Sequence, residues 1–92
     1  MVPAFGRLLS DALAAKGMSQ NAFAKAMGMS QGSLSRMLRG ERKPPVDAVV
    51  SWARYLDLSP KEEHALICAA LVAGGMPKIA ARLDVLATKA LH

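Results

Sequence analysis

The sequence has few cysteines, few aromatic residues and no long apolar run, and each shortage excludes a class of protein. Cys68 is the only cysteine, so neither a disulfide framework nor a cysteine-rich zinc site is expected, and a reducing cytosol fits. The longest apolar run, residues 65–75, is about half of the ~20 residues that span a bilayer, which predicts a buried helix. The residues before Arg7 contain no basic start followed by an apolar segment, so we expect no signal peptide.

The scarcity of aromatic residues, at 4% of 92 residues, argues against a sheet, and no stretch alternates apolar and polar residues. Hydrophobic residues nevertheless make up 52% of the chain, mostly Ala, Leu, Met and Val. This supply is enough for the core of one domain and excludes intrinsic disorder. The composition therefore predicts an all-α fold.

Hydrophobic periodicity and capping residues predict six helices. The first carries Phe5, Leu8, Leu9, Ala12 and Leu13 at helical spacing and should end at Gly17. Short helices follow over Gln20–Met27 and Gln31–Leu38, capped by Ser19 and Ser30 and ended by Gly28 and Gly40. A fourth should begin near Pro45 or Val46, a fifth should run from the capping box Ser59–Glu62 to Ala73, and a sixth should begin at Pro77.

Positive charge is concentrated in the first half of the chain. The net charge is +5, with seven basic and two acidic residues up to Lys43 and five of each from Pro44 onward. A basic small domain has polyanions as its default partners, either nucleic acid or a membrane surface. The excess therefore points to a polyanion bound by the first half.

The stretch from Gln20 to Arg39 has the pattern of a helix-turn-helix. Ala24 is small where two helices must approach, Gly28 provides a positive φ in the turn, and Met29 and Leu34 are apolar where the turn and second helix meet the core. The opposite face of the second helix is polar and free of acids, with Gln31, Ser33, Ser35, Arg36 and Arg39. A helix with such a face fits the major groove of DNA, where Gln pairs with adenine and Arg with guanine.

These residues resemble the lambda-repressor-like, Cro-like (XRE) family of helix-turn-helix transcriptional regulators. The resemblance covers residues 5–56 well and residues 59–73 in outline, and it rests on Gln20, Ala24, Gly28, Met29, Leu34, Met37 and the exit Arg39-Gly40-Glu41-Arg42-Lys43-Pro44-Pro45. It implies a five-helix lambda-repressor-like DNA-binding domain at residues 1–75, with the helix-turn-helix at 20–39. Residues 76–92 would add a C-terminal helix to the same compact unit.

The resemblance also implies which residues contact DNA. Base contacts would be made at Gln31, Gly32, Ser33 and Arg36, although Gly32 stands where family members often carry a base-contacting side chain. Phosphate contacts would be made by Gln20, Ser30, Arg39, Arg42 and Lys43.

The apolar residues of the predicted last helix leave two alternatives open. Ile79, Leu83, Leu86 and Ala90 are spaced by four, three and four residues, like the seam of a coiled coil. The stripe either packs on its own domain or, as we prefer, joins Leu66 in a dimer interface, since a regulator of this size without a second domain must dimerise through its C-terminal helices.

We therefore expect a sequence-specific regulator of transcription that binds double-stranded DNA as a homodimer on a palindromic operator, more often as a repressor than as an activator. No metal site is expected, because His64 and Cys68 are only two potential ligands. No catalysis, cofactor or small-molecule substrate is expected either, because no nucleophile elbow or phosphate-binding loop is present in the sequence. The family implies a cytoplasmic protein of bacterial or phage origin, associated with the nucleoid through DNA. Two alternatives remain: a protein-interaction module of the antitoxin or antagonist type, and a nonspecific nucleic-acid binder.

Overall fold

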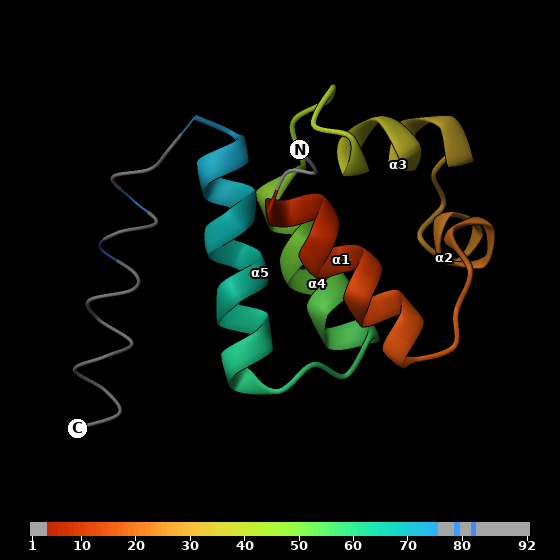
Figure 1. Cartoon of the computed structure of the whole chain (residues 1–92), viewed down its shortest axis with the longest axis horizontal. Helices are drawn as coiled ribbons and strands as arrows, with labels where there is room; N and C mark the ends of the chain where they lie inside the picture. The colour runs from red at the N-terminus through yellow and green to blue at the C-terminus, as the bar shows by residue number, and fades with distance from the viewer. Residues whose placement is uncertain (1–3, 76–78, 80–81, 83–92) are drawn as a thin grey trace.

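The computed structural model describes residues 4–75, 79 and 82, and this part of the chain contains five helices and no strand. The helices are α1 (Ala4–Ala15), α2 (Gln20–Ala26), α3 (Gln31–Leu38), α4 (Val46–Tyr55) and α5 (Pro60–Ala73). In Figure 1, α2 and α3 lie on one side of α1 and α4, and α5 lies on the other side. The predicted all-α fold is confirmed, while the helix expected from Pro77 falls outside the described residues except at Ile79 and Arg82.

The helix starts follow the predicted caps. The hydroxyls of Ser19, Ser30 and Ser59 accept hydrogen bonds from the backbone N–H three residues ahead, at 3.1 to 3.2 Å. At Ser59 the Glu62 carboxylate also accepts from the Ser59 N–H at 3.2 Å, which completes the capping box. Each cap satisfies one of the donors that a helix start leaves unpaired.

Four helices end in the same backbone motif, and the residue at its centre has a positive φ. At the end of α2, Gly28 has φ +70°, and the N–H of Met29 donates to the carbonyl of Ala24 at 2.9 Å. At the end of α4 the central residue is Asp57, with φ +52°, and Leu58 donates to Ala53 at 3.1 Å. This is the Schellman arrangement, in which a left-handed residue turns the chain sharply out of the helix.

The core is a single cluster to which every helix contributes. Trp52 lies at its centre, 5.6 Å from the ring of Phe23 in an edge-on arrangement and 6.5 Å from that of Phe5. The cluster comprises Phe5, Leu9, Ala12, Leu13, Phe23, Ala24, Leu34, Met37, Leu38, Val49, Trp52, Ala53, Leu56, Leu66 and Ala70. Three of the four aromatic residues therefore lie in the core. The rest of the core consists of aliphatic side chains and Met37, whose burial stabilises the fold through the hydrophobic effect.

The expectation that Leu66 lies in a dimer interface is wrong. Its side chain is 1% exposed and belongs to the core cluster. Leu66 and Ala70 are four residues apart, so both lie on the side of α5 that packs against α1 and α4. Of the other predicted interface residues, Ile79 is half exposed, whereas Leu83 and Leu86 lie outside the described residues.

No helix in the described ranges is both long enough and apolar enough to cross a bilayer. All charged side chains there lie outside the core, because no polar or charged residue among them is buried. Any binding role of the charged side chains is therefore a property of the protein surface.

Candidate nucleic-acid interface

The inner face of α3 is packed tightly into the core. Leu34 is fully buried, and Met37 and Leu38 are 4% and 7% exposed. Gly6 of α1 lies beneath the last turn of α3, where a Cβ atom would overlap the carbonyl oxygen of Leu38. The lack of a side chain at Gly6 therefore sets how closely α3 approaches α1, and with it the position of the outer face.

The outer face of α3 begins with polar residues that are open to solvent. Gln20, Ser30, Gln31 and Gly32 are all exposed. A Cβ atom at Gly32 would meet nothing within 4 Å, and the backbone there does not have a positive φ. The fold itself therefore does not require glycine at this position, and a large molecule can come close to the backbone of the first turn.

Ser33 differs from the other predicted base-contacting residues, because its hydroxyl is already engaged. It is half-buried and accepts hydrogen bonds from the Ser30 hydroxyl at 3.0 Å and from Arg42 Nη1 at 2.9 Å. The second bond spans nine residues and holds the Arg42 guanidinium beside the start of α3. Ser33 thus holds the Arg42 cation near the N-terminus of α3. An anion bound there would be attracted both by Arg42 and by the positive end of the helix dipole.

The end of α3 and the following loop carry the other predicted contact residues. Arg36, Arg39 and Lys43 are exposed, as is Arg42. Arg39 Nε lies 2.7 Å from Glu41 Oε2, and Arg39 Nη1 donates to the Ser35 hydroxyl at 3.2 Å. Within the described part of the chain this is the one ion pair, so Arg36, Arg42 and Lys43 have no carboxylate partner there.

The helix starts on this side also lack negative charge. Neither α2 nor α3 has an acidic residue in its first turn, whereas α5 has Glu62 and Glu63. The hydroxyl and the backbone N–H of Ser59, helped by the charge of Lys16, hold the pKa of Glu62 below its ordinary value of 4.5. The positive ends of α2 and α3 are therefore open to an anion, while that of α5 is occupied by its own carboxylates.

The helix pair and its turn match a known family. The model of the family described as Helix-turn-helix aligns with residues 9–62, which is more than half of the chain. The chain belongs to the XRE-type, lambda-repressor/Cro-like helix-turn-helix family. It is thus a DNA-binding helix-turn-helix regulator with the lambda-repressor-like fold. No curated protein and no solved structure matches the chain.

The helix-turn-helix brings together the residues that the sequence placed at the interface. Gln31, Gly32 and Ser33 form the first turn of α3, Arg36 and Arg39 follow along it, and Arg42 reaches back to Ser33. Sequence reasoning gave no role to Gly6, and it did not connect Ser33 with Arg42 or Arg39 with Glu41. The spacing of two residues between Arg39 and Glu41 could have predicted their ion pair. The contact of Gly6 with α3 could not have been predicted, because it depends on the tertiary fold.

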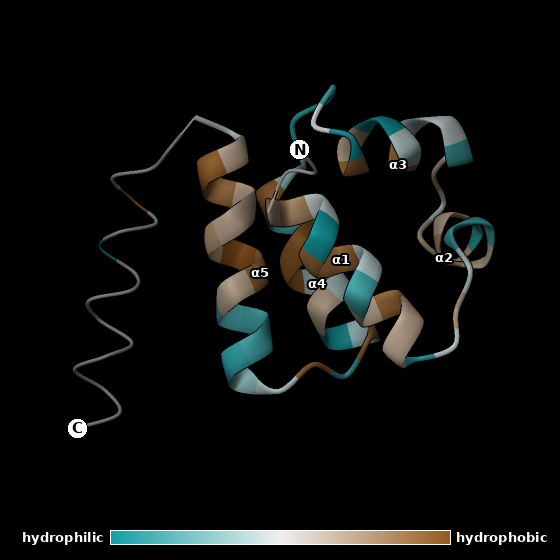
Figure 2. Cartoon of the chain, in the orientation of Figure 1, coloured by the Kyte–Doolittle hydropathy of each residue, from teal (hydrophilic) through white to brown (hydrophobic). Residues whose placement is uncertain are grey.

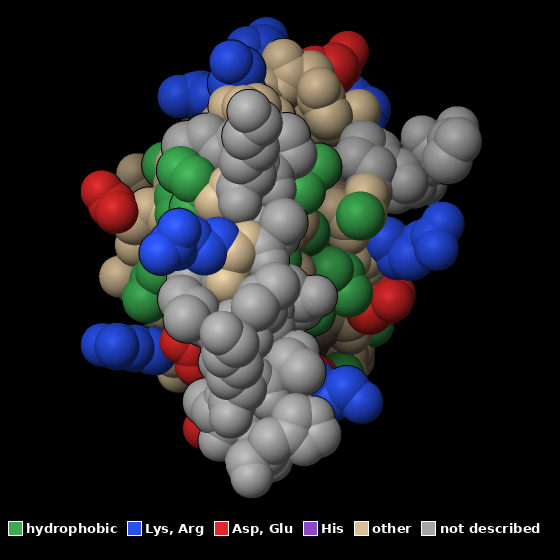
Figure 3. All heavy atoms as spheres, turned by 90° about the vertical axis from the view of Figure 1, so that its left-hand side faces the viewer, with side chains coloured by type: hydrophobic (Ala, Val, Ile, Leu, Met, Phe, Trp, Pro, Cys, Tyr) green, Lys and Arg blue, Asp and Glu red, His purple; other side chains and the backbone are tan. Residues whose placement is uncertain are grey.

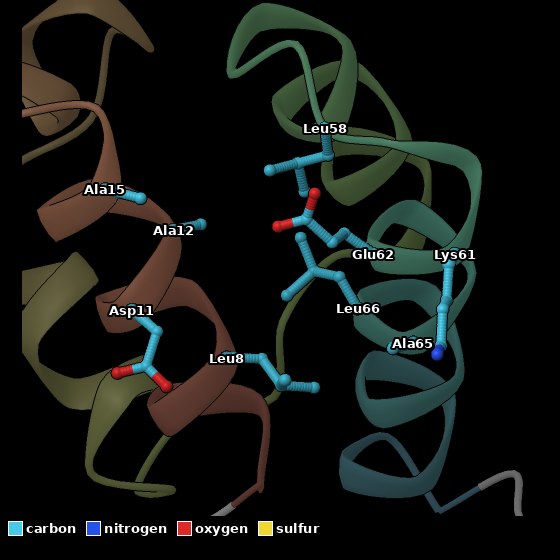
Figure 4. A pocket seen from close by; sticks show the side chains of 9 residues that line it. All are labelled: Leu8, Asp11, Ala12, Ala15, Leu58, Lys61, Glu62, Ala65 and Leu66. Atoms are coloured by element: carbon cyan, nitrogen blue, oxygen red, sulfur yellow. The ribbon is translucent and has the colours of Figure 1, made fainter.

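The opposite side of the molecule has a different character. A groove of about 460 Å³ runs between α1 and α5, lined mainly by apolar side chains such as Leu8 and Leu58 (Figure 4). Hydrophobic side chains gather on the neighbouring face, which includes α5 (Figure 3). His64 and Cys68 lie on α5 with Nε2 and Sγ 3.5 Å apart, and no group of three or more metal-binding side chains occurs among the described residues.

Proposed function

We propose that the chain binds double-stranded DNA sequence-specifically through α3 and represses transcription by occupying a palindromic operator as a homodimer. The observation that carries the proposal is the outer face of α3, which is exposed and free of acids in its first turn. Beside it lie Arg36, Arg42 and Lys43, which have no carboxylate partner among the described residues. Occupancy of the operator excludes other proteins from it, and the mechanism needs neither catalysis nor a cofactor.

Each predicted contact residue has a role in this proposal. Gln31 and Arg36 contact base edges, since Gln pairs with adenine and Arg with guanine through two hydrogen bonds. Gly32 lets the backbone come close to the groove, and Ser33 positions Arg42. Phosphates are bound by Gln20 at the start of α2, by Ser30 at the start of α3, and by Arg39, Arg42 and Lys43 at and after its end. These contacts fix the register of α3 on the duplex.

The homodimer is proposed to form through the C-terminal side of the chain. Val72 is 55% exposed and Ile79 50% exposed, so both side chains are accessible to a second copy of the chain. Leu83 and Leu86 continue the spacing of Ile79 in the sequence. Two copies joined there would present two α3 helices to successive major grooves, about one helical turn or ~34 Å apart.

Selection of bound duplexes from a random pool, with the full chain, tests the proposal. We expect an enriched sequence with two symmetric half-sites separated by about 10 base pairs. A single enriched half-site would contradict the homodimer. The absence of any enriched sequence, with binding that depends only on salt, would identify a nonspecific binder. No binding to duplex DNA at any salt concentration would favour the protein-interaction module.

A further inference from the structure

The hydroxyl of Ser33 can act in a complex with DNA only as a hydrogen-bond donor. Its oxygen accepts from the Ser30 hydroxyl at 3.0 Å and from Arg42 Nη1 at 2.9 Å. A serine hydroxyl has two acceptor lone pairs and one hydrogen, so both lone pairs are in use. Ser33 can therefore bind only an acceptor of the duplex, which excludes the amino groups of cytosine and adenine in the major groove.

The position of Ser33 on α3 is at the border between the buried and the outer face. Ser33 and Met37 are four residues apart and share one row along the helix, and Met37 is 4% exposed. Gly32 and Arg36 form the next row in the same way, and both are exposed. The half-buried Ser33 therefore lies on a flank of the outer face, while Gly32 and Arg36 lie nearer its centre.

This position decides which acceptor of the duplex Ser33 can reach. The major groove is about 12 Å wide, and a helix with its side chains is about 10–12 Å across, so α3 would fill the groove. The central row of the helix then faces the base edges, and its flanks face the two sugar–phosphate walls. The acceptor within reach of Ser33 is therefore a phosphate oxygen.

Arg42 brings positive charge to the same place. The bond to Ser33 spans nine residues and holds the guanidinium at this flank of α3, although Arg42 itself belongs to the loop after the helix. A guanidinium has several N–H donors, and a phosphate accepts strong, charge-assisted bonds from them. A hydroxyl that accepts from a cation is also polarised, which makes it a stronger donor. Ser33 and Arg42 thus present two coupled donors to one anionic group.

We propose that Ser33 and Arg42 bind the same phosphate of the duplex, Ser33 through its hydroxyl hydrogen and Arg42 through its remaining N–H groups, and that Ser33 contacts no base. This inference rests on the proposed function of α3 and changes the role that the sequence predicts for Ser33. The hydroxyl then contributes to the affinity of the complex with the operator and not to the choice of its sequence.

The test compares Ser33→Ala, Arg42→Ala and the double variant. In Ser33→Ala the backbone N–H of residue 33, which donates to the Ser30 hydroxyl at 3.1 Å, is retained, so the helix keeps its cap. Ser51→Ala is the matched control, since it makes the same change at an exposed serine of α4.

Affinities of the full chain are measured by fluorescence anisotropy. The probes are the duplex selected from the random pool, an unrelated duplex of equal length, and copies of the selected duplex in which one phosphate at a time is replaced by a neutral methylphosphonate. The copies identify the phosphate whose charge each side chain uses.

On the unmodified selected duplex, Ser33→Ala should bind about three- to fivefold more weakly than wild type. At one phosphate of each half-site, neutralisation should weaken wild type by about tenfold, Ser33→Ala by about threefold and the double variant by less than about twofold. Ser33→Thr keeps the hydroxyl and should respond as wild type does, as should Ser51→Ala.

Salt dependence separates the charge of Arg42 from the neutral hydroxyl. On the unrelated duplex, Arg42→Ala should flatten the slope of log K against log salt by about 0.9, the value for one lost phosphate contact. Ser33→Ala removes no charge and should change this slope by less than half as much.

Two results would overturn the inference. One is that Ser33→Ala and Arg42→Ala become insensitive at different phosphates, or that Ser33→Ala stays as sensitive as wild type at every phosphate. The other comes from repeating the selection with Ser33→Ala: we expect the same half-site, and a preference lost at one base pair would identify a base contact instead.

The inference and the proposed function fail in different ways. If the wild-type chain selects no sequence, the proposed function is wrong and the inference falls with it. If the wild-type chain selects a sequence and either of the two results above is found, only the inference is wrong.

Discussion

The helices α3 and α5 begin in the same way and then differ at the third residue. Ser30 and Ser59 each cap their helix, and the third residue is Ser33 in α3 but Glu62 in α5. Glu62 returns a bond to Ser59 and, with Glu63, places negative charge at the helix start, whereas Ser33 instead binds Arg42. The same cap is therefore closed to anions in α5 and open to them in α3.

The two helices also differ along their outer faces. Figure 2 shows hydrophilic residues on α3 beyond its first turn, while α5 is hydrophilic at its start and hydrophobic along most of its remaining length. Both helices bury an aliphatic inner face, with Leu34 and Leu66 almost inaccessible. Both helices therefore contribute to the core, while the residues outside it are mainly hydrophilic in α3 and mainly hydrophobic in α5 beyond its first turn.

The largest effect is expected for substitutions in the buried faces of α3 and α5, which the comparison treats as similar. Leu34→Ala and Leu66→Ala should each lower the free energy of unfolding by about 2–5 kcal/mol, because each leaves a cavity in the core. Urea denaturation followed by circular dichroism measures both. A loss below about 1 kcal/mol for Leu34→Ala alone would show that α3 is not held by the core as α5 is.

Converting the cap of α3 into that of α5 should make the start of α3 as unfavourable for anions as the start of α5. Ser33→Glu creates the capping box found in α5 but places a carboxylate at the start of α3, where the proposed function has phosphates bound. We expect unchanged or higher thermal stability and a loss of DNA affinity of at least about tenfold, or ~1.4 kcal/mol. Ser33→Gln is the control, because it can form the capping box without the charge. An equal loss of DNA affinity in the two variants would show that the charge is not its cause.

Gly32 is the second residue of α3, where α5 has Lys61. Gly32→Ala should stabilise the chain by about 0.5–1 kcal/mol, since the added methyl group meets no atom and alanine favours the helix. Operator affinity should fall nonetheless, because the methyl group stands between the helix and the groove. Thermal denaturation and anisotropy measure the two changes, and unaltered affinity would show that the backbone does not come close to DNA.

The smallest expected effect concerns the response of the two caps to acid. The folded chain lowers the pKa of Glu62, so its capping contribution is complete above the pKa of the unfolded chain and is lost as pH falls through the folded value. The stability difference between wild type and Glu62→Gln should therefore shrink when the pH is lowered from 7 to 3. The first turn of α3 has no acidic residue, so the stability difference between wild type and Ser33→Ala should not depend on pH in this way. A similar decrease of that difference between pH 7 and 3 would contradict the contrast between the two caps.

Local signals predicted most of the fold, because they depend on neighbours in the sequence. Serine caps, glycines after the helices and apolar periodicity placed the five described helices, with α2 ending at Ala26 rather than Met27. The turn after α4 was harder to predict, since Asp57 adopts a left-handed conformation that glycine usually takes. Asp adopts this conformation more often than most residues but far less often than Gly, so a single Asp is a weak signal in the sequence.

Contacts between distant residues could not be predicted from the sequence. The burial of Leu66 depends on which face of a largely apolar helix meets α1 and α4, and periodicity cannot decide this when several faces are apolar. The approach of Gly6 to Leu38 and the bond of Arg42 to Ser33 likewise require the tertiary fold. The sequence thus predicted the helix-turn-helix, while the contacts among its side chains came from the structure.

The central claim is that the outer face of α3 distinguishes one DNA sequence from another. It is tested most directly by the ratio of affinities for the selected and the unrelated duplex in Arg36→Ala, with Arg54→Ala as a control at an exposed arginine of α4. The account predicts that Arg36→Ala lowers specific affinity by about 1–3 kcal/mol per half-site and reduces the ratio, while Arg54→Ala leaves the ratio unchanged. An unchanged ratio in Arg36→Ala would contradict the account.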